Sequence, residues 1–458
     1  MPEHAHHLTT TATVLFGVLL VCMVLLLALE EKIHARKSMI TGFFAVLALL
    51  AGAMTDVLPF GEVTLPNGET VGLPVYIPAV DWEVIAIILG SSLFIDVVSR
   101  SGILSWTAIK LTKLSRGDPL VLLSLYATLT VVFSALLNNV TAMIIVGSLT
   151  VVSLEKLRQK PLMLGFLLIE GLLTNIGGLL TLISSVPNII LGQMAGIAFV
   201  DFFLVAAPYT LVATVMTVAM GARIFGISRL KTVEEKRSAA TQVAGFDEND
   251  GIDSPVFFRV SWALLAAFIL TIATTNLIPH VRDLGMGFVA LAFAVIAMLR
   301  YKHEVDRNYA GLDWDLLFFF IFLFVVINVM EHAGVLAVLG SGIGSLTAQG
   351  PVVGGGALLW CASIASSVTD NVPLAAVMGK ILTAQAVPSD SHLWWATIFG
   401  TNLGGNFTPI GSASTVVAVA IIHKHKLKLT FLDFVRRAAP FAIAQLILAT
   451  AYVLVVIR

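Results

Sequence analysis

The sequence predicts an all-α integral membrane protein made of two related halves, each interrupted by polar segments in the middle of the membrane. Three observations lead to this prediction. Of the 458 residues, 58% are hydrophobic and only 12% are charged, whereas about a quarter of the residues of a soluble protein are charged. Apolar runs long enough to cross a bilayer recur along the chain. The same polar phrases also occur twice, at a constant spacing over most of both halves.

Apolar runs of about 17–25 residues predict the membrane helices. The first half, residues 1–225, is expected to have helices at 10–29, 38–57, 82–99 and 204–224, a short helix at 102–114, arms at 118–136 and 139–154, and a broken helix at 162–198. The second half, residues 258–458, repeats this order with 258–278, 283–300, 313–330, 438–457, 335–347, arms at 353–368 and 371–386, and a broken helix at 394–422.

The polar segment 226–257 joins the halves. We interpret it as a solvated cytoplasmic linker, with a regulatory or partner-binding site as the alternative.

A single offset relates the two halves. The same spacing separates Gly102 from Gly334, Asn139 from Asn371 and Asp201 from Asp433. The spacing between Thr174-Asn175 and Thr401-Asn402 is shorter by five positions, which places an insertion or deletion before the broken helix. The pattern predicts an internal duplication.

The arms at 118–154 and 353–386 meet at polar tips and form either re-entrant hairpins or pairs of crossing helices. Hairpins would leave five crossings in each half, an odd number, so the halves would be inverted. Under this model all lysines and arginines except Arg282, Lys380 and Arg458 fall on the cytoplasmic side, which agrees with the positive-inside rule. Both termini would then be extracytoplasmic. The distribution of lysines and arginines supports this orientation of the chain more firmly than it supports the hairpins.

The two tips and the two broken helices form the candidate site, because polar groups within hydrocarbon are costly unless they line a cavity or lie inside the protein. Glycine pairs 177–178 and 404–405 permit unwinding and close backbone approach. The expected site residues are Asn138, Asn139, Thr141, Thr174, Asn175, Ser184, Ser185 and Asn188 in the first half, and Thr369, Asp370, Asn371, Thr401, Asn402, Asn406, Thr408, Ser412 and Ser414 in the second.

Asp370 is the expected coupling residue, because a carboxylate at a hairpin tip must be held by a cation or protonated. The alternative is a carboxylate that only caps its own hairpin. Glu170 is a second coupling candidate, with a structural hydrogen bond as its alternative. Asn139, Asp370 and Asn371 are the candidate ligands for Na⁺, and only Lys380 among basic residues lies near the polar phrases in sequence.

At these phrases the sequence resembles the ion transporter superfamily, in particular the branch of ArsB-type arsenite permeases, NhaD-type sodium/proton antiporters and P protein-like permeases. It is similar more remotely to the dicarboxylate and citrate symporters. The phrases are Leu137-Asn138-Asn139-Val140-Thr141, Glu170 with Thr174-Asn175-Ile176-Gly177-Gly178, Val186-Pro187-Asn188, Thr369-Asp370-Asn371-Val372-Pro373, and Leu403-Gly404-Gly405-Asn406 with Ile410-Gly411-Ser412-Ala413-Ser414. The resemblance implies a scaffold domain, a moving transport domain, a homodimer and elevator-type transport.

Two features depart from the P protein-like pattern. Asn138 stands where that pattern has aspartate, and Ser184-Ser185-Val186-Pro187-Asn188 replaces Gly-Asp-Pro-Pro-Asn. The first half of the site is therefore more neutral than the resemblance implies, which favours an anion there.

These observations predict a secondary transporter, coupled to Na⁺ or H⁺, for a small anion or oxyanion, in the inner membrane of a bacterium. A Na⁺/H⁺ antiporter is the alternative, and an anion channel is the second alternative. The sequence contains no HExxH or GxSxG motif and no basic patch interleaved with aromatic residues. We therefore expect no enzymatic activity, no nucleic-acid partner and no cofactor besides the coupling ion.

Overall fold

The computed structural model describes residues 10–58, 62–64 and 68–457 and is almost entirely helical. The first half contains α1 (Thr10–Ala28), α2 (Glu30–Ile33), α3 (Lys37–Met54), β1 (Glu62–Thr64), β2 (Thr70–Gly72), α4 (Tyr76–Ala79), α5 (Trp82–Ser99), α6 (Ile103–Ser115), α7 (Pro119–Leu136), α8 (Asn139–Lys156), η1 (Lys160–Leu162), α9 (Met163–Gly177), α10 (Val186–Met194) and α11 (Phe199–Ile224). The strands β1 and β2 pair antiparallel.

The linker and the second half contain α12 (Val233–Ala244), α13 (Pro255–Thr274), η2 (Thr275–Leu277), α14 (Pro279–Arg300), η3 (Lys302–Glu304), α15 (Val305–Ala310), α16 (Trp314–His332), α17 (Val335–Thr347), α18 (Pro351–Val368), α19 (Asn371–Ala384), α20 (His392–Gly404), α21 (Ala413–Lys424) and α22 (Phe431–Val455). Among the described residues, twelve helices are long and apolar enough to cross a membrane. The predicted multi-pass membrane protein is therefore confirmed.

Both arms of the first pair, α7 and α8, are among these twelve helices, whereas α19 in the second pair is shorter. The choice between re-entrant hairpins and crossing helices, and the orientation of the termini, stay predictions.

Helix starts recur in the two halves because the same capping residues recur. Asp81 caps α5 and accepts from the Val84 N–H at 3.1 Å. Asp313 caps α16 in the same way, with the Leu316 N–H at 3.0 Å. A side-chain oxygen at this position satisfies one of the free N–H groups of the first turn.

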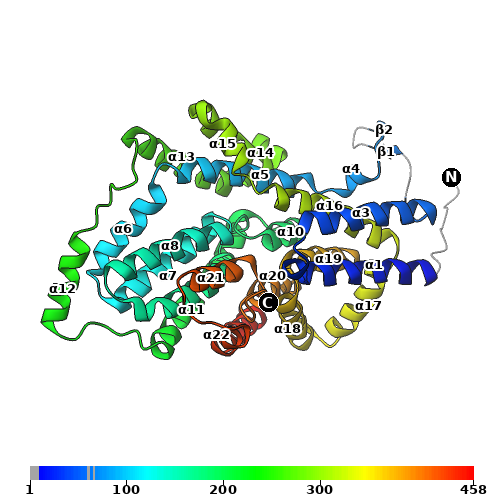
Figure 1. Cartoon of the computed structure of the whole chain (residues 1–458). Coiled ribbons are helices and arrows are strands. Elements are labelled where there is room, and N and C mark those ends of the chain that lie inside the picture. Colours follow the sequence, from blue (N-terminus) through cyan, green and yellow to red (C-terminus); the bar gives the residue numbers. More distant parts are fainter. Residues whose placement is uncertain (1–9, 59–61, 65–67, 458) are drawn as a thin grey trace.

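Four helices, α3, α5, α14 and α16, form a group that we call the frame. Within it, α5 packs against α14 and α16 packs against α3, so each close pair joins the two halves of the chain. Figure 1 shows this exchange: α3 from the first half lies beside α16 from the second. The frame is therefore shared by both halves.

The polar phrases of both halves belong to a second group of helices, α7–α10 and α18–α21, which we call the site helices. Here α7 packs on α9 and α18 packs on α20, while α8 contacts α21 and α19 contacts α10. Each of these contacts thus has a counterpart in the other half. The arrangement brings both interrupted helices to the middle of the molecule, where α10 and α20 lie in Figure 1.

Each broken helix is two helices with an irregular segment between them. The first break spans residues 178–185 between α9 and α10, and the second spans 405–412 between α20 and α21. Several boundaries differ from the expected ones, and the starts of α11 at Phe199 and of α22 at Phe431 differ most. In α22 a capping box formed by Thr430 and Asp433 fixes the earlier start.

The linker differs from a fully solvated tether. Its helix α12 begins with a capping box formed by Thr232 and Glu235, and it packs on α6. Ala239 and Val243 are buried, and Lys113 of α6 pairs with Glu248. The burial of these two apolar side chains explains why α12 packs on α6, and a count of charged residues does not detect it.

Gly90 is a point of very close approach within the frame. A Cβ atom there would lie 2.4 Å from the backbone carbon of Ala290 in α14. We expect Gly90→Ala to separate α5 from α14 and to destabilise the protein by about 1–3 kcal/mol, as overpacking does in a filled core. The measurement is the thermal unfolding midpoint of the purified protein in detergent.

The matched control is Gly17→Ala in α1, where a Cβ atom would have no neighbour within 4 Å. This variant is expected to keep the wild-type midpoint. An unchanged midpoint for Gly90→Ala would contradict the close packing of α5 on α14.

Candidate functional site

The two helix breaks are joined by a reciprocal pair of hydrogen bonds. Asn175, at the end of α9, donates to the Ser412 hydroxyl at 3.0 Å. The Ser185 hydroxyl donates to Asn402, at the end of α20, at 2.8 Å. Asn175 corresponds to Asn402, and Ser185 to Ser412, at the spacing that relates the two broken helices. Each break therefore supplies an amide to the other break and receives a hydroxyl from it.

The first cluster extends from Asn175. Its amide also donates to Asn406 at 2.8 Å, and its oxygen accepts from Ser414 at 3.3 Å and Asn139 at 3.5 Å. Thr174 donates to Ser414 at 2.9 Å. Six predicted residues thus come together here: Asn139, Thr174, Asn175, Asn406, Ser412 and Ser414.

The second cluster extends from Asn402. Its amide donates to Asn188 at 2.9 Å, and Asn188 in turn donates to the Gly178 carbonyl at 2.6 Å. Ser184 donates to that same carbonyl at 2.7 Å. Side-chain hydrogen bonds therefore replace the helical ones that the backbone loses at the break.

Each break is fastened to its pair of arms by a serine in the first arm of that pair. Ser134 donates to the Thr174 carbonyl and Ser366 donates to the Thr401 carbonyl, both at 2.6 Å. These bonds pair residues at matching positions of the two halves. Thr408 adds a further bond to α18, the same arm that carries Ser366, through the Ser367 carbonyl at 2.5 Å.

The glycine pairs allow these close contacts. A Cβ atom on Gly177 would lie 2.7 Å from the Val131 backbone in α7, and one on Gly404 would lie 2.3 Å from the Ser363 carbonyl in α18. Both distances are shorter than any side chain could tolerate. Glycine is therefore required where each interrupted helix meets its hairpin arm.

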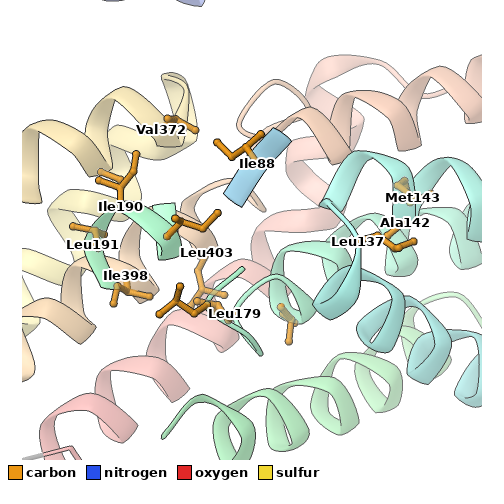
Figure 2. Close-up of a cluster of buried hydrophobic side chains, with 14 of the residues drawn as sticks. Ile88, Leu137, Ala142, Met143, Leu179, Ile190, Leu191, Val372, Ile398 and Leu403 are labelled. Atoms are coloured by element: carbon orange, nitrogen blue, oxygen red, sulfur yellow. The ribbon is translucent and has the colours of Figure 1, made fainter. Parts of the chain in front are cut away.

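Apolar side chains surround these polar groups. Figure 2 shows Leu137 near the first tip, Val372 near the second tip, and Ile88 of α5 between them. Leu179, within the first break, and Leu403, just before the second, are fully buried. The polar clusters are therefore enclosed largely by hydrocarbon.

Five tip residues lie outside both clusters: Asn138, Thr141, Thr369, Asp370 and Asn371. Asn138 caps α8 through the Thr141 N–H at 2.8 Å. The side chains of Thr141 and Asn371 form no hydrogen bond with the described residues, and Thr369 bonds to its own helix through the Ala365 carbonyl. No hydrogen bond in this part of the chain joins Asn139 to Asp370 or Asn371, so the expected Na⁺ ligand set stays a prediction.

Asp370 has a partner that the sequence did not reveal. Its side chain caps α19 through the Val372 N–H at 3.0 Å and contacts the Lys37 ammonium at 2.5 Å. Sequence proximity suggested only Lys380, which instead pairs with Glu331 of α16 at 2.9 Å. Lys37 lies at the start of α3, in the opposite half of the chain from Asp370, and no repeated phrase marks it.

Glu170 is separate from both clusters and is completely buried in α9. Thr150 of α8 donates to its Oε1 at 2.6 Å, and its Oε2 has no hydrogen-bond partner among the described residues. The sequence also gave no signal for Gln445 of α22. This side chain accepts from Asn406 at 2.8 Å and donates to Thr217 at 2.9 Å.

Comparisons with known proteins address the same region. The family model described as Citrate transporter, CitMHS, matches residues 24–400. The uncharacterized transporter Rv2684 of Mycobacterium tuberculosis is 29% identical over 379 residues, which cover 81% of this chain and 86% of that protein.

The P protein of Homo sapiens is 22% identical over 506 residues, covering 94% of this chain but only 58% of the P protein. Among solved structures, the YdaH transporter of Alcanivorax borkumensis superposes with a TM-score of 0.54 at 14% identity, over 96% of this chain and 97% of that one. The last match concerns the fold alone.

The reciprocal contact can be tested at Asn402. Asn402→Ala leaves buried polar groups of Ser185 and Asn188 without partners, so we expect a loss of about 1–3 kcal/mol of stability. The thermal unfolding midpoint in detergent measures it. Asn371→Ala is the control for stability, because Asn371 forms no side-chain hydrogen bond with the described residues; a loss as large as that of Asn402→Ala would contradict the assignment.

Proposed function

The chain belongs to the citrate transporter family, and from this premise we propose that it is a secondary active transporter that couples Na⁺ or H⁺ to the movement of a small anion or oxyanion. The resemblance to the ion transporter superfamily, including the P protein, is confirmed by the family match and by the relatives. We place the protein in the inner membrane of a bacterium, which agrees with its mycobacterial relatives.

The observation that carries this proposal is the pair of reciprocally bonded helix breaks. The helices α10 and α21 begin at the breaks, whereas α9 and α20 end there. Helix N-termini present N–H groups that attract anions, and C-termini present carbonyls that attract cations. Together with neutral amides and hydroxyls, these helix ends suit a small anion and a cation bound near each other.

Inverted repeats and an elevator motion belong to the same proposal. Support comes from the exchanged packing of α5 with α14 and of α3 with α16, which is the pattern expected for two halves related by a two-fold axis. In the proposed motion the site helices move as a unit against the frame. A homodimer, implied by the resemblance, completes the proposal.

Two carboxyl groups are the proposed coupling residues. Asp370 lies at a hairpin tip where a cation can reach it, with 15% of its side chain exposed. Glu170 lies within α9 and has a buried oxygen that lacks a hydrogen-bond partner among the described residues. Buried ionisable groups in membrane segments commonly mark ion pathways.

A Na⁺/H⁺ antiporter is the alternative, in which Asp370 alternates between the two cations and no anion moves. An anion channel is the second alternative. Two discontinuous helices that meet around one site favour alternating access over an open pore.

Proteoliposomes that contain a pH-sensitive dye distinguish these functions. With a Na⁺ gradient alone, the proposed transporter should move no protons, and uptake should begin when citrate, phosphate, sulfate or arsenite is supplied. Asp370→Asn should abolish coupled uptake. Proton movement driven by Na⁺ alone and lost in Asp370→Asn would establish the antiporter instead, and a current that reverses at the equilibrium potential of the anion would establish the channel.

Glu170→Gln tests the second coupling candidate. The amide retains the size of the side chain and the oxygen that accepts from Thr150, but it cannot exchange a proton. We expect a wild-type unfolding midpoint together with transport that no longer depends on pH across the neutral range. Wild-type transport with unchanged pH dependence would leave Glu170 with a structural hydrogen bond only.

A further inference from the structure

Three charged side chains meet where the second hairpin touches the frame. Lys37, the first residue of α3, lies 2.5 Å from Asp370 and 3.6 Å from Glu30 of α2. The three side chains are between 15% and 28% exposed. One ammonium group is thus held between a carboxylate on the hairpin and a carboxylate next to the frame.

This cluster is present at only one of the two hairpin tips. At the offset that relates the halves, Asn138 corresponds to Asp370, so the first tip has a neutral amide in place of the carboxylate. An apolar cavity of about 330 Å³, which Leu136, Leu137 and Ile269 help to line, lies beside that tip. The first tip is therefore built without a carboxylate, and the charged cluster is specific to the second.

The charge balance determines when the hairpin can separate from α3. While Lys37 neutralises Asp370, separation would leave a bare carboxylate in a poorly solvated site, which is costly. If a cation binds Asp370, that carboxylate is paired on the hairpin, and Lys37 keeps its contact with Glu30 beside the frame. These two pairs can move apart without exposing an unpaired charge.

We propose that Lys37 is an internal counter-cation that competes with the transported cation for Asp370, and that Glu30 receives the displaced ammonium. This inference rests on the proposed cation-coupled function and adds the step that releases the second hairpin from α3. A transported Na⁺ or H⁺ breaks the contact between α19 and α3, so the hairpin moves only when a cation occupies Asp370.

Two neighbouring acids have other partners. Asp315 of α16 accepts from the Ser38 hydroxyl at 2.5 Å and from the Ser38 N–H at 3.3 Å. Glu331 of α16 pairs with Lys380, which lies further along α19. The Lys380–Glu331 pair also links α19 to the frame but does not involve Asp370, so it provides a matched control.

The test measures cation binding to purified full-length protein through the rise in its unfolding midpoint as NaCl replaces choline chloride in alkaline buffer. A parallel pH titration in choline chloride measures proton binding. Lys37→Met removes the competitor, so the cation that binds the wild type should bind at least about tenfold more tightly, as expected when a close charge pair is lost. Glu30→Gln removes the receiving carboxylate, so the same cation should bind several-fold more weakly.

Lys380→Met should keep the wild-type affinity, and Asp370→Asn should abolish the response. Opposite shifts for Lys37→Met and Glu30→Gln would not arise from a general loss of stability. If Lys37→Met does not fold, Lys37→Gln replaces it. Unchanged or weaker cation binding in the Lys37 variant would overturn the role of Lys37 alone, whereas a wild type that responds to neither Na⁺ nor pH would overturn cation coupling itself.

Discussion

The central constraint on this molecule is that polar groups inside a membrane must find partners within the protein. Two helices are interrupted, and each interruption leaves N–H and carbonyl groups without helical partners. Side chains of the same half satisfy several of these carbonyls, as Ser184 and Asn188 do at Gly178. Across the breaks, the polar side chains satisfy one another, since Asn175 bonds Ser412 and Asn402 bonds Ser185. Hairpin serines and glycine pairs then bring the arms close enough to complete the clusters. The arrangement of the site helices follows from this mutual dependence.

Much of the helical fold could be predicted from the sequence, because hydropathy determines span length and polar phrases within apolar runs indicate where a helix is broken. The breaks at 178–185 and 405–412 lie within the segments predicted to be broken. Helix starts were less accurate where a side-chain cap decides them, as Thr430 does for α22. The docking of α12 on α6 also escaped prediction, because it depends on a few apolar side chains within a charged segment.

The candidate site was predicted in part for a similar reason. Asn175, Asn402 and their serine partners stand out as polar residues in apolar runs, and the repeat pairs them. Lys37 and Gln445 have no such signal, because neither belongs to a repeated polar phrase. Each reaches the site only through the tertiary packing of its helix. The residues that break the symmetry are thus the ones that sequence comparison between the halves cannot reveal. Lys37 contacts the tip at Asp370, whereas Gln445 contacts Asn406 at the second break.

The exchanged packing between the halves has a consequence for biosynthesis. Asn175 leaves the ribosome 237 residues before Ser412, its partner across the breaks. At a synthesis rate of about 5–20 residues per second, the first break would wait roughly 12–50 s in the membrane before its partner is made. During that interval its amides and hydroxyls need temporary partners, such as water, lipid headgroups or the insertion machinery. The order of synthesis therefore exposes the first half, and not the second, to misassembly and to degradation by quality control.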